Sequence, residues 1–359
     1  FTIEGRVGRP MHKAATPSAV LDGAPSVVVS GIYAYVPDNT NGGSDNFLIF
    51  DISTSTNPTL VGSLASGFNI PQGIAVSGNY AYVPSSANNI FYVIDVSNPV
   101  SPVVKGSIAH GAGGALLSWP IDVAVSGNYA YIVSNLSDAL EIVDVSDPGN
   151  IRHVSATSSN MLDGATAIHV AGRYAYVISN SVSKLVIFDI SDPTNPRDVG
   201  SLTDTGSISM GGPLDIFVLG NYAYIASNSD SALAVVDVSD PTNPVQRGSV
   251  ANGSGGALLS RPASVFVSGN YAYVASQTSD ALEIIDISNP FSPVHKGLLG
   301  NGTNGALLDG AISVFVLGNY AYIASTDSDA LEVVDISGAV ISNAEIGTAK
   351  ISNLQTMAS

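Results

Sequence analysis

The chain has 359 residues, of which 45% are hydrophobic and 11% charged, and its net charge is −17. Apolar residues that recur regularly exclude a disordered chain, and no apolar run reaches the roughly 18 residues of a membrane-spanning helix. The negative charge disfavours nucleic acid and anionic lipid as partners, and the lack of cysteine excludes disulfides, thiolate metal sites and cysteine nucleophiles.

The first six residues differ from everything that follows. Ile3-Glu4-Gly5-Arg6 matches the recognition sequence of the protease factor Xa, and Phe1-Thr2 resembles the end of a recombination-vector linker. We therefore interpret residues 1–6 as a cloning remnant that takes no part in function. Residues 7–338 are interpreted as one domain.

From residue 33 onward a repeat dominates the sequence. The tripeptide Tyr-Ala-Tyr occurs seven times at spacings of 45 to 49 residues, and an aliphatic stretch that ends in Asp follows each copy. The copies begin at Tyr33, Tyr80, Tyr129, Tyr174, Tyr222, Tyr271 and Tyr320. The stretches end at Asp51, Asp95, Asp144, Asp189, Asp237, Asp286 and Asp335. Such a period is typical of solenoids and propellers.

One unit of the repeat predicts four short strands. Turns and Pro-containing breaks separate its β-branched and aromatic runs, and Gly269-Asn270 joins the first two. In this unit the runs cover residues 264–268, 271–275, 281–287 and 294–299. Both faces of such a sheet are apolar, so each unit must pack between neighbours. The sequence therefore predicts an all-β, seven-bladed β-propeller with four antiparallel strands per blade, and an open solenoid is the alternative.

The third strand of several units carries a characteristic motif. Examples are Leu140-Glu141-Ile142-Val143-Asp144, Leu185-Val186-Ile187-Phe188-Asp189 and Leu282-Glu283-Ile284-Ile285-Asp286. With the preceding Gly-Asn-Tyr-Ala-Tyr, these segments resemble the LVIVD-repeat family over about residues 24–338. The resemblance implies the propeller fold and an extracellular interaction module, and it implies no reaction.

Residues that recur in every unit are expected to serve the scaffold. The carboxylate at the end of each third strand can accept backbone N–H bonds and hold the following turn. The tyrosines are interpreted as packing residues, with sugar stacking as the alternative. We expect no cofactor, although Asp327-Ser328-Asp329 offers oxygen ligands of the kind that Ca²⁺ prefers. His169 replaces Val, Ala or Phe of the other units, which favours a buried histidine over a catalyst.

The loops that enter the first strands differ between units. In a propeller these strands are innermost, so seven loops converge at one end of the axial channel, which is where a ligand site would lie. Tolerated drift of the loop sequences is the alternative explanation of the variation. The candidate ligand-binding residues are Asp22, Trp119, Asp122, Asp163, Asp215, Arg261 and Asp309. Acids and an aromatic suit a cation, a basic peptide or a sugar. The opposite end carries nearly uniform Gly-Asn turns.

These observations favour a non-enzymatic interaction or adhesion module that is extracellular or on the cell surface. We expect a protein or glycan ligand on one propeller face, no nucleic acid, no membrane insertion, and a monomeric head of a longer chain. The alternative is a hydrolase or lyase with a carboxylate site in the channel. A buried pair among Asp122, Asp163 and Asp215 with a raised pKa would favour that enzyme.

The two ends of the chain are expected to close the ring. The last repeat ends near Ser337 without a fourth strand, and Pro10-Met11-His12-Lys13-Ala14 parallels Pro293-Val294-His295-Lys296-Gly297. We predict that residues 10–15 pair with the strand that ends at Asp335, with Ala344 to Ile351 as the rival segment. Residues 339–359 are interpreted as a junction to a downstream stalk.

Overall fold

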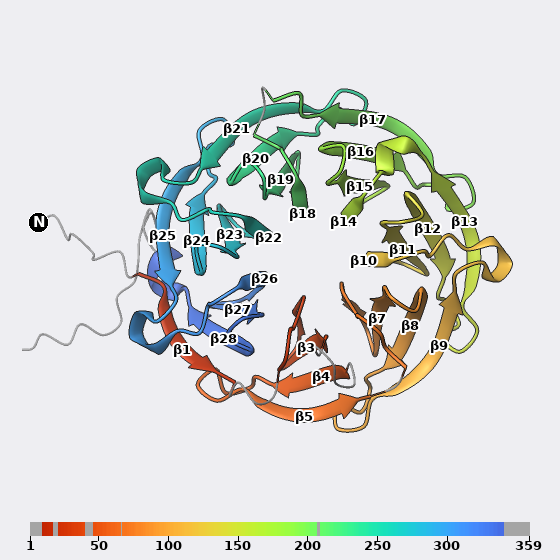
Figure 1. The fold of residues 1–359 in the computed structure, drawn as a ribbon, viewed down its shortest axis with the longest axis horizontal. Helices are drawn as coiled ribbons and strands as arrows, with labels where there is room; N and C mark the ends of the chain where they lie inside the picture. The colour runs from red at the N-terminus through yellow and green to blue at the C-terminus, as the bar shows by residue number, and fades with distance from the viewer. Residues whose placement is uncertain (1–8, 17–20, 40–45, 66, 207–208, 341–359) are drawn as a thin grey trace, which may run out of the picture.

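The seven repeats fold into a closed ring of blades. The computed structural model describes residues 9–16, 21–39, 46–65, 67–206 and 209–340, and within them seven four-stranded sheets surround a central axis (Figure 1). All strand pairs within these sheets are antiparallel. The structure thus confirms the predicted seven-bladed β-propeller. No helix in the described ranges is long and apolar enough to span a membrane.

Each blade uses its four strands in the same radial order. The innermost strands are β2 (Val28–Ser30), β6 (Ala75–Ser77), β10 (Pro120–Ser126), β14 (Ala165–Ala171), β18 (Pro213–Leu219), β22 (Pro262–Ser268) and β26 (Ala311–Leu317). The second strands are β3 (Tyr33–Asp38), β7 (Tyr80–Ser85), β11 (Tyr129–Ser134), β15 (Tyr174–Ser179), β19 (Tyr222–Ser227), β23 (Tyr271–Ser276) and β27 (Tyr320–Ser325). The third strands are β4 (Asn46–Asp51), β8 (Ile90–Asp95), β12 (Ala139–Asp144), β16 (Lys184–Asp189), β20 (Ala232–Asp237), β24 (Ala281–Asp286) and β28 (Ala330–Asp335). We number the blades 1 to 7 in this order.

The outer strands and the short helical turns complete the blades. The outer strands are β5 (Thr59–Leu64), β9 (Val103–Ala109), β13 (Arg152–Ser158), β17 (Arg197–Thr203), β21 (Val245–Ala251), β25 (Val294–Gly300) and, in blade 7, β1 (Met11–Ala15). The short helical turns are η1 (Ala112–Gly114), η2 (Asn160–Leu162), η3 (Ser254–Gly256), η4 (Thr303–Gly305) and α1 (Ser337–Val340).

The N-terminal strand completes the last blade. Strand β1 pairs antiparallel with β28, with Met11 opposite Asp335, and the two lie side by side although one is near each end of the chain (Figure 1). The predicted pairing of residues 10–15 is therefore confirmed. The rival segment, Ala344 to Ile351, lies outside the described residues.

The hydrophobic core lies between neighbouring blades. In one cluster, the buried side chains of Leu233 and Val235 on β20 pack with Val265 on β22 and Ile285 on β24. Every blade contributes to two such clusters, which is why both faces of each sheet are apolar. The tight turn between β22 and β23 uses Gly269 at φ 58°, a left-handed conformation that glycine adopts without strain.

The recurring aspartates hold the turns after the third strands. In all seven blades the Oδ1 atom accepts the backbone N–H two residues further on, at 2.8 to 3.0 Å. This geometry is the turn-holding role expected from the sequence.

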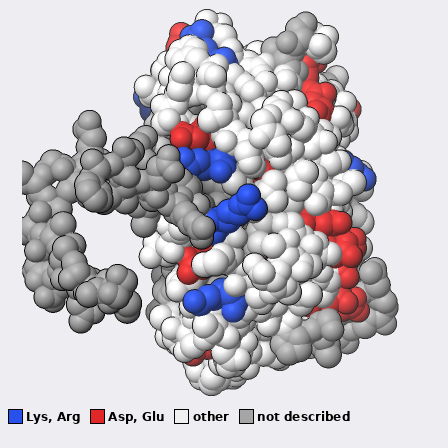
Figure 2. Space-filling model, turned by 90° about the vertical axis from the view of Figure 1, so that its left-hand side faces the viewer, with Lys and Arg blue, Asp and Glu red and all other residues white. Residues whose placement is uncertain are grey.

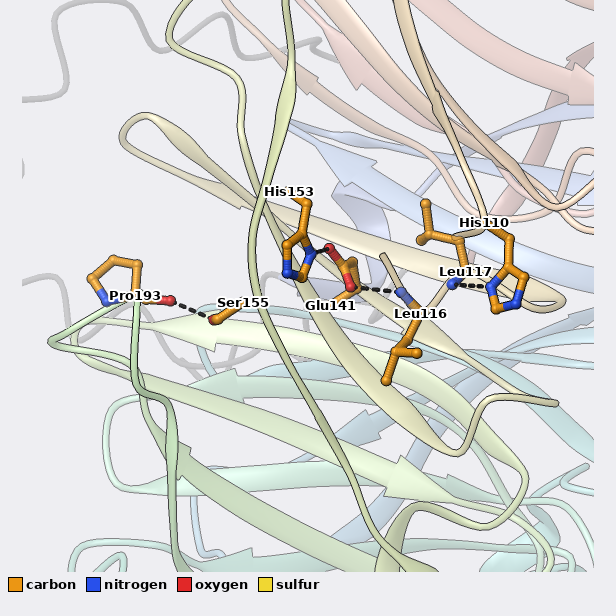
Figure 3. A network of polar contacts seen from close by, with 7 residues as sticks. All are labelled: His110, Leu116, Leu117, Glu141, His153, Ser155 and Pro193. Atoms are coloured by element: carbon orange, nitrogen blue, oxygen red, sulfur yellow. Dashed lines mark hydrogen bonds and ion pairs between the residues drawn. The ribbon is translucent and has the colours of Figure 1, made fainter. Parts of the chain in front are cut away.

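A buried Glu–His pair, which the sequence analysis did not predict, joins strands to loops in three blades. Oε2 of Glu141 on β12 accepts the Leu116 N–H at 2.9 Å, and Oε1 lies 2.6 Å from Nδ1 of His153 on β13 (Figure 3). Burial raises the pKa of Glu141. The same Glu–His brace occurs as Glu283 with His295 and Leu258, and as Glu332 with His12 and Leu307. In blade 7 the brace therefore fastens β1 to the ring.

Candidate functional site

One position at the innermost strand recurs around the channel, and in four blades its side chain accepts a backbone N–H of the next blade. We call it the inter-blade position, and it is held by Ser26, Gly73, Asp122, Ala167, Asp215, Ser264 and Ser313. Oγ of Ser264 accepts the N–H of Val314 in the next blade at 3.3 Å. Oγ of Ser313 accepts the N–H of Val27 at 3.1 Å, across the closure of the ring. A serine hydroxyl is thus sufficient for the link.

Two blades make the same link with a carboxylate. Oδ2 of Asp122 accepts the N–H of Ile168 at 2.9 Å, and Oδ2 of Asp215 accepts the N–H of Val265 at 2.8 Å. Burial raises the pKa of Asp122 to about 7, the negative charge of Asp215 adds to the rise, and the backbone N–H bonds oppose it. Burial also raises the pKa of Asp215. The channel wall therefore holds two interacting carboxyl groups, each half-buried.

A pocket of about 300 Å³ lies on the axis between the innermost strands, and both carboxylates line it. The aromatic rings of blades 4 to 7 form part of its wall, with centroid separations of 4.7, 4.8 and 4.7 Å between successive rings. This aromatic arc consists of His169, Phe217, Phe266 and Phe315. The equivalent positions in blades 1 to 3 hold the smaller Val28, Ala75 and Ala124. The wall is therefore lopsided, aromatic on one side and small on the other.

The pocket has negative groups without a cationic side chain to balance them. Among the described residues that line it there is no Lys or Arg. His169 is the basic group in the wall, and burial lowers its pKa to about 4, so its imidazole is neutral at neutral pH. As expected from the sequence, this histidine packs within the ring and lies against Phe217.

The entry face, formed by the loops that lead into the innermost strands, contains backbone strain. The residue three positions before the inter-blade position has a positive φ in every blade, and in four blades it is glycine. The other three are Ile70 (φ 56°), Trp119 (φ 56°) and Arg261 (φ 51°). A non-glycine residue in this conformation costs roughly 1–2 kcal/mol. Comparing the seven entry loops with the glycine positions could have revealed this strain from the sequence.

Blade 3 presents an apolar spot at its strained residue. The Trp119 N–H donates to Oδ1 of Asn89 at 2.7 Å, and the Leu136 N–H donates to the carbonyl oxygen of Ser118 at 3.2 Å. These bonds place the half-buried Trp119 and Leu136, which is 66% exposed, on adjoining loops. We call Trp119 and Leu136 the blade 3 spot.

Carboxylates gather on the entry face at the junction of blades 6, 7 and 1. Residual burial and the charges of Asp280 and Asp327 raise the pKa of Asp309. Burial and the charges of Asp22 and Asp327 raise that of Asp329. In the side view the acidic side chains lie mainly along one edge of the molecule (Figure 2). This acidic cluster makes one part of the entry face strongly negative.

The seven candidate residues occupy three kinds of place. Asp122 and Asp215 lie together in the pocket wall, and Trp119 and Arg261 are the strained residues of blades 3 and 6. Asp22, Asp163 and Asp309 are exposed, each directly before a left-handed glycine. Asp22 and Asp309 belong to the acidic cluster, whereas Asp163 lies in blade 4. Within the described ranges, no three acidic or histidine side chains gather as a metal site.

The opposite end of the channel, the turn face, carries the Gly-Asn turns. A hollow of about 410 Å³ lies there between blades 6 and 7. Asn270, Tyr271, Tyr273, Asp286 and Asn319 are among the residues that line it. A ligand on this face would contradict the placement of the site on the entry face.

Comparison with protein families gives one match over most of the chain. The LVIVD repeat matches residues 23–66, 71–109, 121–156, 164–204, 211–252, 262–299 and 310–343. These segments correspond to the seven blades, so the resemblance noted in the sequence is confirmed. A search of curated proteins gave no match.

Several solved structures are similar in fold at low sequence identity. A functionally unknown protein from Desulfotomaculum acetoxidans is 17% identical with a TM-score of 0.64, over 82% of this chain and 90% of that one. The periplasmic gluconolactonase of Pseudomonas aeruginosa is 14% identical with a TM-score of 0.66, over 78% and 86%. Hydrazine synthase of Kuenenia stuttgartiensis is 14% identical with a TM-score of 0.69, over 89% and 97%. At these identities the similarity shows the fold alone.

Proposed function

Because the chain belongs to the LVIVD-repeat family, with one repeat in each blade, we propose that it is a non-enzymatic interaction module. Its partner, a protein or glycan, binds the entry face. The proposal includes an extracellular or cell-surface location, which rests on the resemblance to LVIVD-repeat proteins.

The strained residues of the entry face carry this proposal. Four blades place glycine at the left-handed position, so the scaffold does not need a side chain there. Trp119 and Arg261 nevertheless keep large side chains at a cost in stability, and such strain is typical of functional surfaces. Trp119 also adjoins the exposed Leu136, and tryptophan is enriched in binding hot spots.

The acidic cluster indicates the charge of the partner. A surface rich in carboxylates attracts basic groups and speeds their association. A basic protein segment, or a glycan that carries amino groups, suits an entry face that combines such a surface with the blade 3 spot.

The test is a binding screen with matched variants. Wild-type protein is compared with Trp119→Gly and Leu136→Thr, which copy residues found at these positions in other blades, against basic peptides and a glycan array. We expect both variants to lose about tenfold or more in affinity. Loss of binding with Asn270→Ala and Asn319→Ala on the turn face, and none with the entry-face variants, would contradict the proposal.

The second candidate function is hydrolysis or elimination by the channel carboxylates. The observation that favours it is the half-buried pair Asp122 and Asp215, since a carboxyl group with a pKa of about 7 exchanges protons readily at neutral pH. Turnover of a sugar-lactone panel, abolished by Asp122→Ser and Asp215→Ser, would support this enzyme. Absence of turnover together with partner binding would support the interaction module.

A further inference from the structure

We propose that the channel pocket binds an organic ammonium group, with Asp122 and Asp215 as its counter-charges. The inference rests on the proposed binding function and names a ligand class for a second site, inside the ring. It is distinct from the partner surface because the blades themselves bound the pocket.

The first argument is that the charge of these carboxylates exceeds what the scaffold needs. Ser264 and Ser313 make the same inter-blade bond without a charge. Replacing serine by aspartate keeps the acceptor but buries an ionisable group, which is costly unless a positive charge offsets it. A cation in the pocket would supply that charge.

The second argument is that the chain does not provide the cation. The described residues of the pocket wall include neither Lys nor Arg, and His169 is neutral at neutral pH. Both carboxylates accept backbone hydrogen bonds. Asp122 accepts the Ile168 N–H, and Asp215 accepts the N–H groups of Val265 and Ile216 at 2.8 and 2.7 Å. These neutral donors hold the carboxylates in place and leave the net negative charge uncompensated.

The third argument selects an ammonium ion over a metal ion. The aromatic arc offers ring faces and edges rather than oxygen ligands, and aromatic faces attract ammonium groups. A metal such as Ca²⁺ requires six to eight oxygen ligands, and among the described residues no three acidic or histidine side chains gather to supply them. Val28 and Gly73 line the pocket together with the arc. A pocket of about 300 Å³ accommodates a small amine or methylated ammonium compound.

The decisive experiment compares two ligands of equal shape. Choline and 3,3-dimethylbutan-1-ol differ in having a quaternary nitrogen or a quaternary carbon, so the difference in affinity reports the charge. Calorimetry with the full chain at about pH 8, where Asp122 is mostly ionised, should show choline binding about tenfold or more tightly than the neutral alcohol. At about pH 5 the choline affinity should fall by about tenfold, because Asp122 becomes protonated.

Matched variants test whether Asp122 and Asp215 cause the preference for choline over the neutral alcohol. Asp122→Ser and Asp215→Ser retain the inter-blade acceptor and should each weaken choline binding by about tenfold while changing the affinity for the neutral alcohol by less than about twofold. Asp240→Ser, on the turn face, removes the same charge from the molecule and should leave choline binding unchanged. Circular dichroism and melting temperature verify that every variant is folded.

Three outcomes would overturn the inference. These are equal affinity for choline and the alcohol, choline affinity that persists in both channel variants, and no choline binding at any concentration tested. Displacement of choline by calcium that depends on Asp122 would also contradict the proposal, because it would show that the pocket binds a metal ion. Because choline binding is measured without any partner, its failure and the failure of the entry-face proposal can be told apart.

Discussion

Blades 3 and 6 share one scaffold and differ at the surfaces that a ligand can reach. Both contain the Glu–His brace, a glycine-rich 3₁₀ turn and a left-handed residue before proline. At the three divergent positions blade 3 has Trp119, Asp122 and Leu136, where blade 6 has Arg261, Ser264 and Thr278. The residues shared by the two blades belong to the scaffold, and the residues proposed for binding are among those that differ.

The largest effect should come from removing a part that the common scaffold requires. Deleting residues 1–16 removes β1 and leaves β28 as an exposed edge in blade 7. We expect aggregation or loss of the cooperative melting transition, measured by light scattering and calorimetry. Deleting residues 1–8 leaves β1 intact and is the control. An unchanged melting temperature after the longer deletion would show that the closure contributes little.

Breaking the Glu–His brace should affect blades 3 and 6 equally. Glu141→Ala and Glu283→Ala each leave a backbone N–H without its acceptor and a histidine without its partner. The expected loss is about 3–5 kcal/mol in the free energy of unfolding, measured by chemical denaturation. In blade 3, Glu141→Ala with His153→Gln copies the pair Ala234 and Gln246 of blade 5 and should recover part of the loss. A much larger loss of stability in one variant than in the other would show that the Glu–His braces of blades 3 and 6 are not equivalent.

Making blade 3 resemble blade 6 at the channel should raise stability at alkaline pH. Because the folded pKa of Asp122 lies above its ordinary value, its contribution to stability is full below about pH 4 and is lost as pH rises through 7. Relative to wild type, Asp122→Ser should therefore gain up to about 4 kcal/mol at pH 8 and little at pH 4. Denaturation of both proteins at several pH values measures this difference in the free energy of unfolding. The lowered pKa of His169 makes stability depend on pH in the opposite sense, but His169 is present in both proteins, so its contribution cancels. A constant difference across pH would contradict the raised pKa.

The smallest effect should come from relieving strain on the entry face. Trp119→Gly gives blade 3 the residue that four other blades use at this left-handed position, and relief of strain should add about 1 kcal/mol against the loss of tryptophan packing. A melting temperature equal to or above that of wild type is expected. Gly310→Trp, the reverse change in blade 7, should lower it, since a Cβ there would lie 2.7 Å from Oγ1 of Thr326. A large fall in the melting temperature of Trp119→Gly would show that the tryptophan side chain stabilises the fold.

Local patterns in the sequence predicted the architecture. The Tyr-Ala-Tyr tripeptide and the third-strand motif each repeat seven times, the Gly-Asn turn occurs in five of the seven units, and the likeness of residues 10–14 to 293–297 predicted the closure. Asp122 and Asp215 were also identified from the sequence, as candidate ligand-binding residues of the channel. The Glu–His brace was not predicted, although Glu141 and Glu283 each precede their histidine by 12 residues. Pairing across a bulge between two strands is a tertiary contact that spacing alone does not reveal.

The site was harder to predict because it depends on contacts between blades. The electrostatic interaction of Asp122 with Asp215 arises from ring geometry, which brings blades 3 and 5 toward one axis. Likewise, His169 and the three phenylalanines were recognised as equivalent positions, but their ring contacts follow from closure of the propeller.

The position of β1 has a consequence for the time order of folding. During synthesis β1 emerges before the other strands of the propeller and its partner β28 after them, and the bond between His12 and Glu332 spans 320 residues of chain. Blades 1 to 6 can pack against one another in the order of their synthesis, whereas β1 has no partner strand during that time. Contacts of such sequence separation form slowly. We therefore expect the pairing of β1 with β28 to be the last step of folding, and the ring of blades to remain open until it occurs.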